Sequence, residues 1–431
     1  MMSKKNGDLA ILGGEPAVPP GMIHKWPPID DTDRTMVLAS LDGQSHSFGP
    51  NCRAFEEEFA RWNGNRHAIF TNSGTAALHM AVAACGVGAG DHVLVPAYSW
   101  SSSATCVIHH NAIPVFVDID FATMNLDPSK IEAAITPRTK AVMVVHLHGL
   151  SANMEEIRAV AARHGLRVIE DACQAHGALF RGRKVGTLGH CAGFSFNQNK
   201  CLCTGEGGMF VTDDPELRDR AVQLWSFGET RTPAESRDYH AYALGWMYRA
   251  SDLTAAFGRA QLGKLDRYLA VQQENAAALR AGLDGLPGLI LPHVPEGHVH
   301  TWYNFTTRLD MAALGWTGDP RQMRDAVMKA LNAEGVPVHV WQSYILPAMT
   351  VFQARNAYGG GCPWSCRGAG EGVEYRPDDY PAAQAHCDTH FGMTEPLRAP
   401  NGTDVAARVA EGFRKVLENI GRIAPEPVAG E

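Results

Sequence analysis

Apolar runs rich in Val and Ile alternate with amphipathic stretches in the first part of the chain, and this alternation restricts the fold more than any other feature. Strand-like runs occur at 68–71, 92–98, 113–119, 141–149 and 167–173. Stretches with apolar residues at helical spacing lie between them, at 76–85, 101–110, 128–136 and 154–165. Buried parallel strands have continuous apolar runs because helices cover both faces of their sheet. The sequence therefore predicts an α/β fold with right-handed crossover connections.

The length of 431 residues predicts more than one domain, because a single hydrophobic core stops growing well below that size. Residues 1–30 are rich in Gly and Pro and are expected to form an arm. A helical stretch at 262–283 and a Gly/Pro-rich hinge at 285–296 separate a large domain, 31–285, from a small domain, 286–431. In the small domain we expect strands at 303–309 and 336–340, a Gly/Pro/Cys-rich excursion at 355–381 and a closing helix at 404–420.

Composition and charge exclude several classes of protein. The chain is 45% hydrophobic and 19% charged, with a net charge of −8, and it lacks the basic runs that bind nucleic acid. No apolar stretch reaches the roughly 18 residues that a membrane span needs, and the first residues do not resemble a secretion signal. We therefore expect a cytoplasmic protein that binds neither nucleic acid nor membrane.

Ten cysteines are scattered along the chain, and we expect them to be reduced. Ligand types that suit zinc gather in one region, at Cys362, Cys366, His386, Cys387 and His390. Their spacing fits no compact zinc motif, so we expect no metal site.

A short polar segment, Asn72-Ser73-Gly74-Thr75, lies between a predicted strand and a predicted helix. Small residues at such a junction let free backbone N–H groups converge on an anion at the positive end of the helix dipole. The segment is therefore a candidate phosphate cradle. The alternative is an ordinary helix N-cap, since Ser and Thr are common there.

Asp171 ends an apolar strand, at the edge where open α/β sheets bind ligands. A buried carboxylate needs a cationic partner to stay ionised, and the protonated pyridine nitrogen of pyridoxal 5′-phosphate (PLP) is one such partner. The alternative is that Glu170 or Asp171 only caps the following turn.

Lys200 ends the segment GFSFNQNK (193–200), and the glycine-rich TGEGG (204–208) follows closely. A lysine buried in such a loop has a lowered pKa, as a Schiff-base lysine requires, whereas a solvated surface lysine is the alternative. The order of phosphate cradle, strand-end acid and glycine-flanked lysine on one α/β chain favours a PLP enzyme.

Six motifs make the chain resemble the DegT/StrS family of PLP-dependent sugar and aminocyclitol aminotransferases. They are NSGTAAL (72–78), GAGDHVLVPAYSW (88–100), PVFVDID (114–120), IEDACQAHGA (169–178), GFSFNQNK (193–200) and GEGGMFVTDD (205–214). The resemblance runs from Leu12 to Leu262, with a weaker tail. It implies fold-type I, in which a mostly parallel seven-stranded sheet sandwiched by helices is joined to a smaller α+β C-terminal domain.

The resemblance assigns the two catalytic roles to Lys200 and Asp171. Lys200 would form the Schiff base with PLP and carry the proton during transfer, while Asp171 would pair with the pyridine nitrogen. An amino donor would leave as its keto acid before the ketone acceptor is converted, so ping-pong kinetics are expected.

The remaining cofactor contacts are also implied by the resemblance. Ser195 and the backbone of Gly74 and Thr75 would hold the phosphate, and Gln174 would lie near the phenolic oxygen. Trp100 would stack on the pyridine ring, although a core tryptophan is the alternative.

One position departs from the family pattern. Family members commonly carry an Asn that reaches across a homodimer to the partner's phosphate, within a Tyr-Asn-Tyr-Arg-Met stretch. This chain has Met247 there, which cannot donate that hydrogen bond. The homodimer is still expected, and Arg249 or another residue is a candidate replacement.

The resemblance implies transfer from an amino acid, such as glutamine, glutamate or alanine, to a ketone on a cyclitol or sugar ring. The segments LGGEPA (12–17) and GCPW (361–364) favour the aminocyclitol branch, and hence antibiotic or other secondary-metabolite biosynthesis. Tyr344 and Arg249 are candidate substrate residues.

Two alternatives keep the fold but change the function. Sugar dehydratases of this family replace the lysine by histidine, so Lys200 favours amino transfer. A non-catalytic regulatory protein on the same fold is the other alternative, because fold alone does not guarantee turnover.

Overall fold

The computed structural model of the protein describes residues 8–230 and 239–425. The structure does not describe residues 1–7 of the predicted arm or residues 426–431 of the predicted small domain. The expectation that residues 1–30 form an arm is therefore only partly covered. None of the described helices combines the length and apolarity that a bilayer crossing requires.

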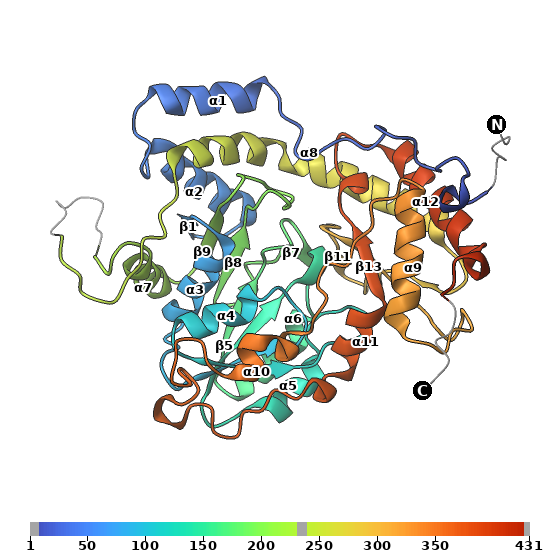
Figure 1. Cartoon of the computed structure of the whole chain (residues 1–431). Coiled ribbons are helices and arrows are strands. Elements are labelled where there is room, and N and C mark those ends of the chain that lie inside the picture. Colours follow the sequence, from blue (N-terminus) through green and yellow to red (C-terminus); the bar gives the residue numbers. More distant parts are fainter. Residues whose placement is uncertain (1–7, 231–238, 426–431) are drawn as a thin grey trace.

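A seven-stranded sheet forms the centre of the molecule (Figure 1). Its strands are β1 (His67–Thr71), β2 (His92–Pro96), β3 (Ile113–Val117), β4 (Thr139–Val145), β5 (Arg167–Asp171), β8 (Cys191–Ser195) and β9 (Gly208–Thr212). They are arranged in the order β1-β9-β8-β5-β4-β2-β3, and only β9 runs antiparallel to its neighbours. The predicted mostly parallel seven-stranded α/β sheet is confirmed.

Helices cover both faces of this sheet. One face packs against α3 (Gly74–Ala84), α4 (Ser102–His109) and α7 (Pro215–Trp225). The other face packs against α2 (Pro50–Asn63), α5 (Pro128–Ala134), α6 (Met154–Arg163) and the first half of α8 (Asp252–Leu283). Successive residues of a strand point to opposite faces. Accordingly, Ile169 belongs to the α3/α4 core and Val168 to the α2/α6 core, which also fixes the directions of Asp171 and Glu170.

A separate core lies around the second half of α8, toward the C-terminus. It contains residues of β12 (Phe305–Leu309), α9 (Pro320–Ala333), β13 (His390–Met393) and α12 (Thr403–Leu417). Short β10 (Leu289–Ile290) pairs with β12 at the edge of this unit. The long helix α8 therefore spans both cores, and α1 (Asp31–Asp42) lies along its first half (Figure 1).

Two segments pack against a core that is formed mainly by distant parts of the chain. Leu9 and Val18 of the arm are buried in the C-terminal core, where the backbone N–H of Val18 donates to the Glu334 carbonyl at 2.9 Å. Conversely, the segment with α10 (Thr350–Ala354) and α11 (Pro381–Thr389) returns to the α3/α4 face, where Phe352 and Tyr375 are buried. A small sheet of β6 (Leu179–Phe180), β7 (Arg183–Lys184) and β11 (His298–Val299) completes the fold.

The predicted strand at 336–340 is wrong. Val336 and Val338 are buried and gave a strand-like pattern, but only His339 pairs, in an isolated bridge with Gly392. Pro337 has no N–H group to donate to a ladder, which limits pairing to this single bridge.

Two predicted boundaries also move. The long helix begins at Asp252 rather than 262, and the Ser251 side chain caps it by accepting from the N–H of Leu253 at 3.1 Å. The strand predicted at 141–149 ends at Val145. Beyond it, His148 at φ 56° and Gly149 at φ 100° turn the chain out of the sheet.

Candidate active site

The predicted site residues meet at one edge of the central sheet. Strands β1, β8, β5, β4 and β2 run in the same direction, so their carboxyl ends share that edge. This is the edge at which open α/β sheets bind ligands.

The segment 72–75 connects β1 to α3, as predicted. The Ser73 side chain caps the helix by accepting from the N–H of Ala76 at 3.1 Å. The N–H groups of Gly74 and Thr75 precede any intrahelical acceptor and have no hydrogen-bond partner among the described residues. The segment is therefore both an N-cap and a pair of free donors suited to an anion.

Gly74 brings the cradle against Ser195, the last residue of β8. A Cβ atom at Gly74 would lie 2.6 Å from the Ser195 Cβ and 3.0 Å from the Cys173 Sγ. Real Cβ atoms do not approach this closely, so the contact requires glycine.

Asp171 ends β5 and is 5% exposed. Its Oδ2 accepts a hydrogen bond from the Ser103 hydroxyl at 2.6 Å, and its Oδ1 accepts from the N–H of Cys173 at 3.2 Å. Within residues 8–230 and 239–425, no lysine, arginine or histidine forms an ion pair with this carboxylate. A buried carboxylate in that condition is a site for a cation.

The Cys173 thiol lies near the charged groups of the site. Burial, and then the negative charge of Asp171, raise its pKa well above the usual value, while the charge of Lys200 acts in the opposite direction. The thiol is therefore neutral at pH 7. Asp171 and Lys200 are near enough to one side chain for both charges to affect its pKa.

Gln174 is buried, and its Oε1 accepts a hydrogen bond from the backbone N–H of His148 at 2.8 Å. This bond fixes the orientation of the amide, so its NH₂ group is the donor that remains. Burial, followed by neighbouring histidines and Lys200, lowers the pKa of His148 well below the usual value, so this ring is neutral.

Lys200 lies in the loop between β8 and β9, and its side chain is directed at Tyr303. The Lys200 Nζ donates to the Tyr303 hydroxyl at 3.3 Å and lies 4.5 Å from the centre of the ring. Lys200 is half-buried, and its amine contacts a 5%-exposed tyrosine of the C-terminal half, so the alternative of a fully solvated surface lysine is not met.

Two distant residues hold the backbone of the Lys200 loop. The Trp26 indole N–H donates to the Lys200 carbonyl at 3.0 Å, and the Arg398 guanidinium donates to the Asn199 carbonyl at 2.6 Å. Arg398 also lies over the Trp26 ring, 5.2 Å from its centre. The arm and the C-terminal unit thus fix the loop together.

Trp100 and Tyr344 lie on the open side of this region. Trp100 follows β2, is 53% exposed, and lies 6.0 Å from Trp341, measured between ring centres. Tyr344 is 60% exposed, and nearby Leu346 donates its N–H to the Ala97 carbonyl at 2.8 Å, which ties this segment to the end of β2.

Met247 and Arg249 lie beside the cradle. The Met247 carbonyl accepts from the Asn72 side chain at 3.4 Å, while its side chain is 51% exposed. Arg249 forms a backbone bridge with Thr71, and its guanidinium lies 5.3 Å from the centre of the Phe227 ring. The roles predicted for both positions stay predictions.

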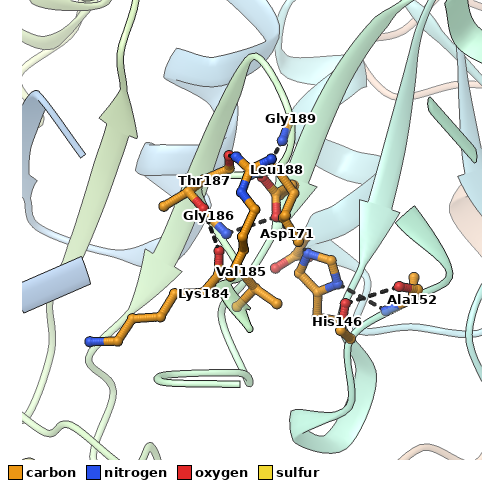
Figure 2. A network of polar contacts seen from close by, with 12 residues as sticks. His146, Ala152, Asp171, Lys184, Val185, Gly186, Thr187, Leu188 and Gly189 are labelled. Carbon is orange, nitrogen blue, oxygen red and sulfur yellow. Dashed lines mark hydrogen bonds and ion pairs between the residues drawn. The ribbon is translucent and has the colours of Figure 1, made fainter. Parts of the chain in front are cut away.

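Glu170 supports the same strand end from the face opposite to Asp171, and its partners His146, Gly186 and Leu188 are labelled in Figure 2. Its carboxylate accepts from His146 Nε2 at 2.9 Å, and from the N–H groups of Gly186 at 2.7 Å and Leu188 at 2.8 Å. Burial alone would raise its pKa, but these bonds hold the pKa below the usual value. Glu170 therefore joins β4, β5 and the turn after β7, and holds Asp171 in place.

Four residues near the site were not found from the sequence. The serine run after Trp100 is a local signal that points to Ser103. Tyr303, Trp26 and Arg398 carry no such signal, because their partners are more than ninety positions away along the chain.

The zinc-ligand types in the C-terminal half do not gather into a site. Among the described residues, no group of three or more His, Cys, Asp or Glu side chains is arranged to hold a metal ion. His390 instead bonds to the Tyr98 hydroxyl at 2.9 Å.

A model of the DegT/DnrJ/EryC1/StrS aminotransferase family matches residues 27–371. The chain is similar to the GDP-perosamine synthase of Caulobacter vibrioides, with 41% identity over 74% of this chain and 85% of the relative. It is also similar to the L-glutamine:2-deoxy-scyllo-inosose aminotransferase of Streptomyces kanamyceticus, with 41% identity over 73% of this chain and 75% of the relative.

A solved structure shows the same fold. DesV of S. venezuelae, crystallised with a ketimine intermediate, is 31% identical and superposes with a TM-score of 0.77 over 90% of this chain and 94% of that chain.

The Glu170 network predicts a pH-dependent contribution to stability. Because the folded pKa is lowered, the contribution is present above the unfolded value of about 4.3 and is lost as the pH falls through the folded value. Glu170→Gln should reduce the free energy of unfolding by about 3 kcal/mol at pH 7. Its difference from the wild type should shrink below pH 4, as measured by denaturant unfolding.

Glu132→Gln is the matched control, since Glu132 pairs with His164 and Arg163 on the exposed surface. That variant should unfold almost like the wild type. Equal losses in the two variants would show that the Glu170 network does not stabilise the strand end.

Proposed function

Because the chain belongs to the DegT/DnrJ/EryC1/StrS aminotransferase family, we propose that it moves an amino group from an amino acid to a ketone on a cyclitol or sugar ring. Family membership confirms the enzyme class, the fold-type I architecture and the PLP cofactor that the motifs predicted. One observation of this chain carries the proposal: the buried carboxylate of Asp171, which has no ion-pair partner among the described residues, lies in the same site as the Lys200 amine.

The side chains fit PLP group by group. The free N–H groups of Gly74 and Thr75, with the Ser195 hydroxyl, would hold its phosphate. Asp171 would pair with the protonated pyridine nitrogen, and the remaining donor of Gln174 would bond to the phenolic oxygen. Trp100 would cover the ring. When bound, PLP supplies an electron sink for the reacting carbon.

Lys200 would move the proton. Its Nζ is the basic atom at the site, and general acid–base transfer by a positioned amine needs that atom within hydrogen-bond reach of its target. The Ser103 hydroxyl fixes the Asp171 carboxylate through a hydrogen bond of 2.6 Å, and a carboxylate held there would favour the protonated form of the ring nitrogen. The Tyr303 hydroxyl would hold the Lys200 amine in place while it takes up and delivers the proton.

For the substrates, we propose an amino donor such as glutamine, glutamate or alanine and a keto-cyclitol or keto-sugar acceptor. The inosose aminotransferase and the perosamine synthase among the relatives support these classes. Tyr344 and Arg249 are proposed to line the acceptor site, and antibiotic or other secondary-metabolite biosynthesis is the proposed context.

We further propose a cytoplasmic homodimer. Met247 does not supply the cross-subunit hydrogen bond that the family's asparagine makes. Arg249, which is anchored beside the cradle through its bridge to Thr71, is the proposed replacement.

Amino transfer is tested with the PLP-loaded protein. Glutamine, glutamate and alanine are each combined with scyllo-inosose, 2-deoxy-scyllo-inosose and a nucleotide-linked keto-sugar, and the amine product is measured by mass spectrometry. The wild type should aminate at least one acceptor, and Lys200→Ala should aminate none. A PLP-loaded wild type that converts no pair of substrates would favour the non-catalytic alternative.

The cradle predicts that Gly74→Ala weakens PLP binding. The added Cβ would press against Ser195, so the dissociation constant for PLP, measured by fluorescence titration, should rise at least roughly tenfold. Gly88→Ala is the control, because no atom lies within 4 Å of the Cβ it would add. Equal affinities in both variants would exclude the proposed cradle.

The Tyr303 hydroxyl predicts a selective loss of rate. Tyr303→Phe should lower kcat roughly tenfold while KM and PLP content change little, because only the placement of the Lys200 amine is affected. Tyr268→Phe is a matched control, since the buried Tyr268 hydroxyl has no hydrogen-bond partner within the described part of the chain. Similar kcat values in the two variants would remove Tyr303 from the mechanism.

A further inference from the structure

Two thiols meet on the glycine-rich excursion at 355–381, outside the active site. The Cys366 Sγ lies 3.0 Å from the Cys362 Sγ, and both residues are half-buried. All ten cysteines are within the described residues, and none is in a disulfide.

The other thiol pair of the chain differs in access to solvent. Cys85 and Cys191 are 3.6 Å apart, but Cys191 is 1% exposed inside the α3/α4 core. A reagent in solution can reach both sulfur atoms only in the pair on the excursion. Thiol exchange requires such access as well as a thiolate.

The backbone holds the two cysteines on one tight turn. The N–H of Cys362 donates to the Gly359 carbonyl at 3.1 Å, and the N–H of Cys366 donates to the Pro363 carbonyl at 3.0 Å. Trp364, between the two cysteines, anchors this turn to the rest of the protein, because its indole N–H donates to the Tyr375 hydroxyl at 2.8 Å. The sulfur atoms are thus kept together by local structure.

Metal binding does not account for this pair. A structural zinc site needs four ligands, and the described residues supply no third His, Cys, Asp or Glu to the two thiols. The contact is therefore better suited to sulfur–sulfur chemistry.

We propose that Cys362 and Cys366 are a modification site that forms a reversible disulfide by exchange with a small disulfide such as oxidised glutathione. One thiolate attacks the reagent, forms a mixed disulfide and releases one glutathione thiolate. The second cysteine thiolate then attacks the protein sulfur of the mixed disulfide and releases the other glutathione. The two cysteine protons pass to solvent or to glutathione, and the two electrons reduce the reagent.

The proposal is independent of the proposed amino transfer. The pair lies on a segment that bonds to the amino ends of the central strands, since His92 at the start of β2 contacts the Ala369 carbonyl at 2.7 Å. The site residues follow the opposite, carboxyl ends. The disulfide should therefore leave the PLP content unchanged.

The test uses the purified full-length protein, incubated in its folded state with oxidised glutathione, then unfolded in denaturant, alkylated to block free thiols and digested with trypsin. Both cysteines fall in one tryptic peptide, 356–367, because no Lys or Arg lies between Arg355 and Arg367. We expect this peptide to escape alkylation, to be lighter than its reduced form by two hydrogen atoms, and to recover both thiols with a reducing agent. Peptides with Cys85 and Cys191 should stay alkylated.

Single variants separate the two steps of the exchange. Cys362→Ser should stop at a mixed disulfide on Cys366, and Cys366→Ser at one on Cys362, whereas Cys85→Ser should behave like the wild type. An unoxidised peptide 356–367, or mixed disulfides that accumulate on both cysteines of the wild type, would overturn the proposal.

Discussion

The site depends on the buried carboxylate of Asp171, held at the end of β5 without a cation among the residues that the structure describes. Its two hydrogen bonds, from Ser103 and from the Cys173 backbone, fix its position but do not neutralise its charge. A carboxylate in this state favours a bound group that carries a proton on nitrogen. The cradle, the Lys200 loop and the amide of Gln174 are arranged around that requirement.

The strand period assigns opposite tasks to two adjacent acids. Asp171 faces the α3/α4 side and is directed to the site, while Glu170 faces the α2/α6 side and bonds to His146 and to the turn after β7. The Asp171 carboxylate is thus available for a ligand, while the Glu170 carboxylate bonds to neighbouring parts of the protein. A shift of the strand by one residue would exchange these roles.

The sequence predicted those parts of the site that depend on contacts between residues close together along the chain. The cradle, Asp171 and Lys200 lie in local patterns of strand, turn and helix, so the sequence indicated them. Tyr303, Trp26 and Arg398 reach the Lys200 loop from the arm and the C-terminal unit, and no local pattern records such contacts. The strand expected at 336–340 failed for a local reason, since Pro337 cannot join a ladder while its buried valine neighbours imitate one.

Lys200 is proposed as the residue that binds PLP covalently, and reduction of the holoenzyme with borohydride is the decisive test. Reduction fixes the carbon–nitrogen bond, and peptide mapping by mass spectrometry then locates the pyridoxyl group. We expect one modified residue, Lys200. A pyridoxyl group on any other lysine, or a PLP-loaded protein with no modified lysine, would contradict it.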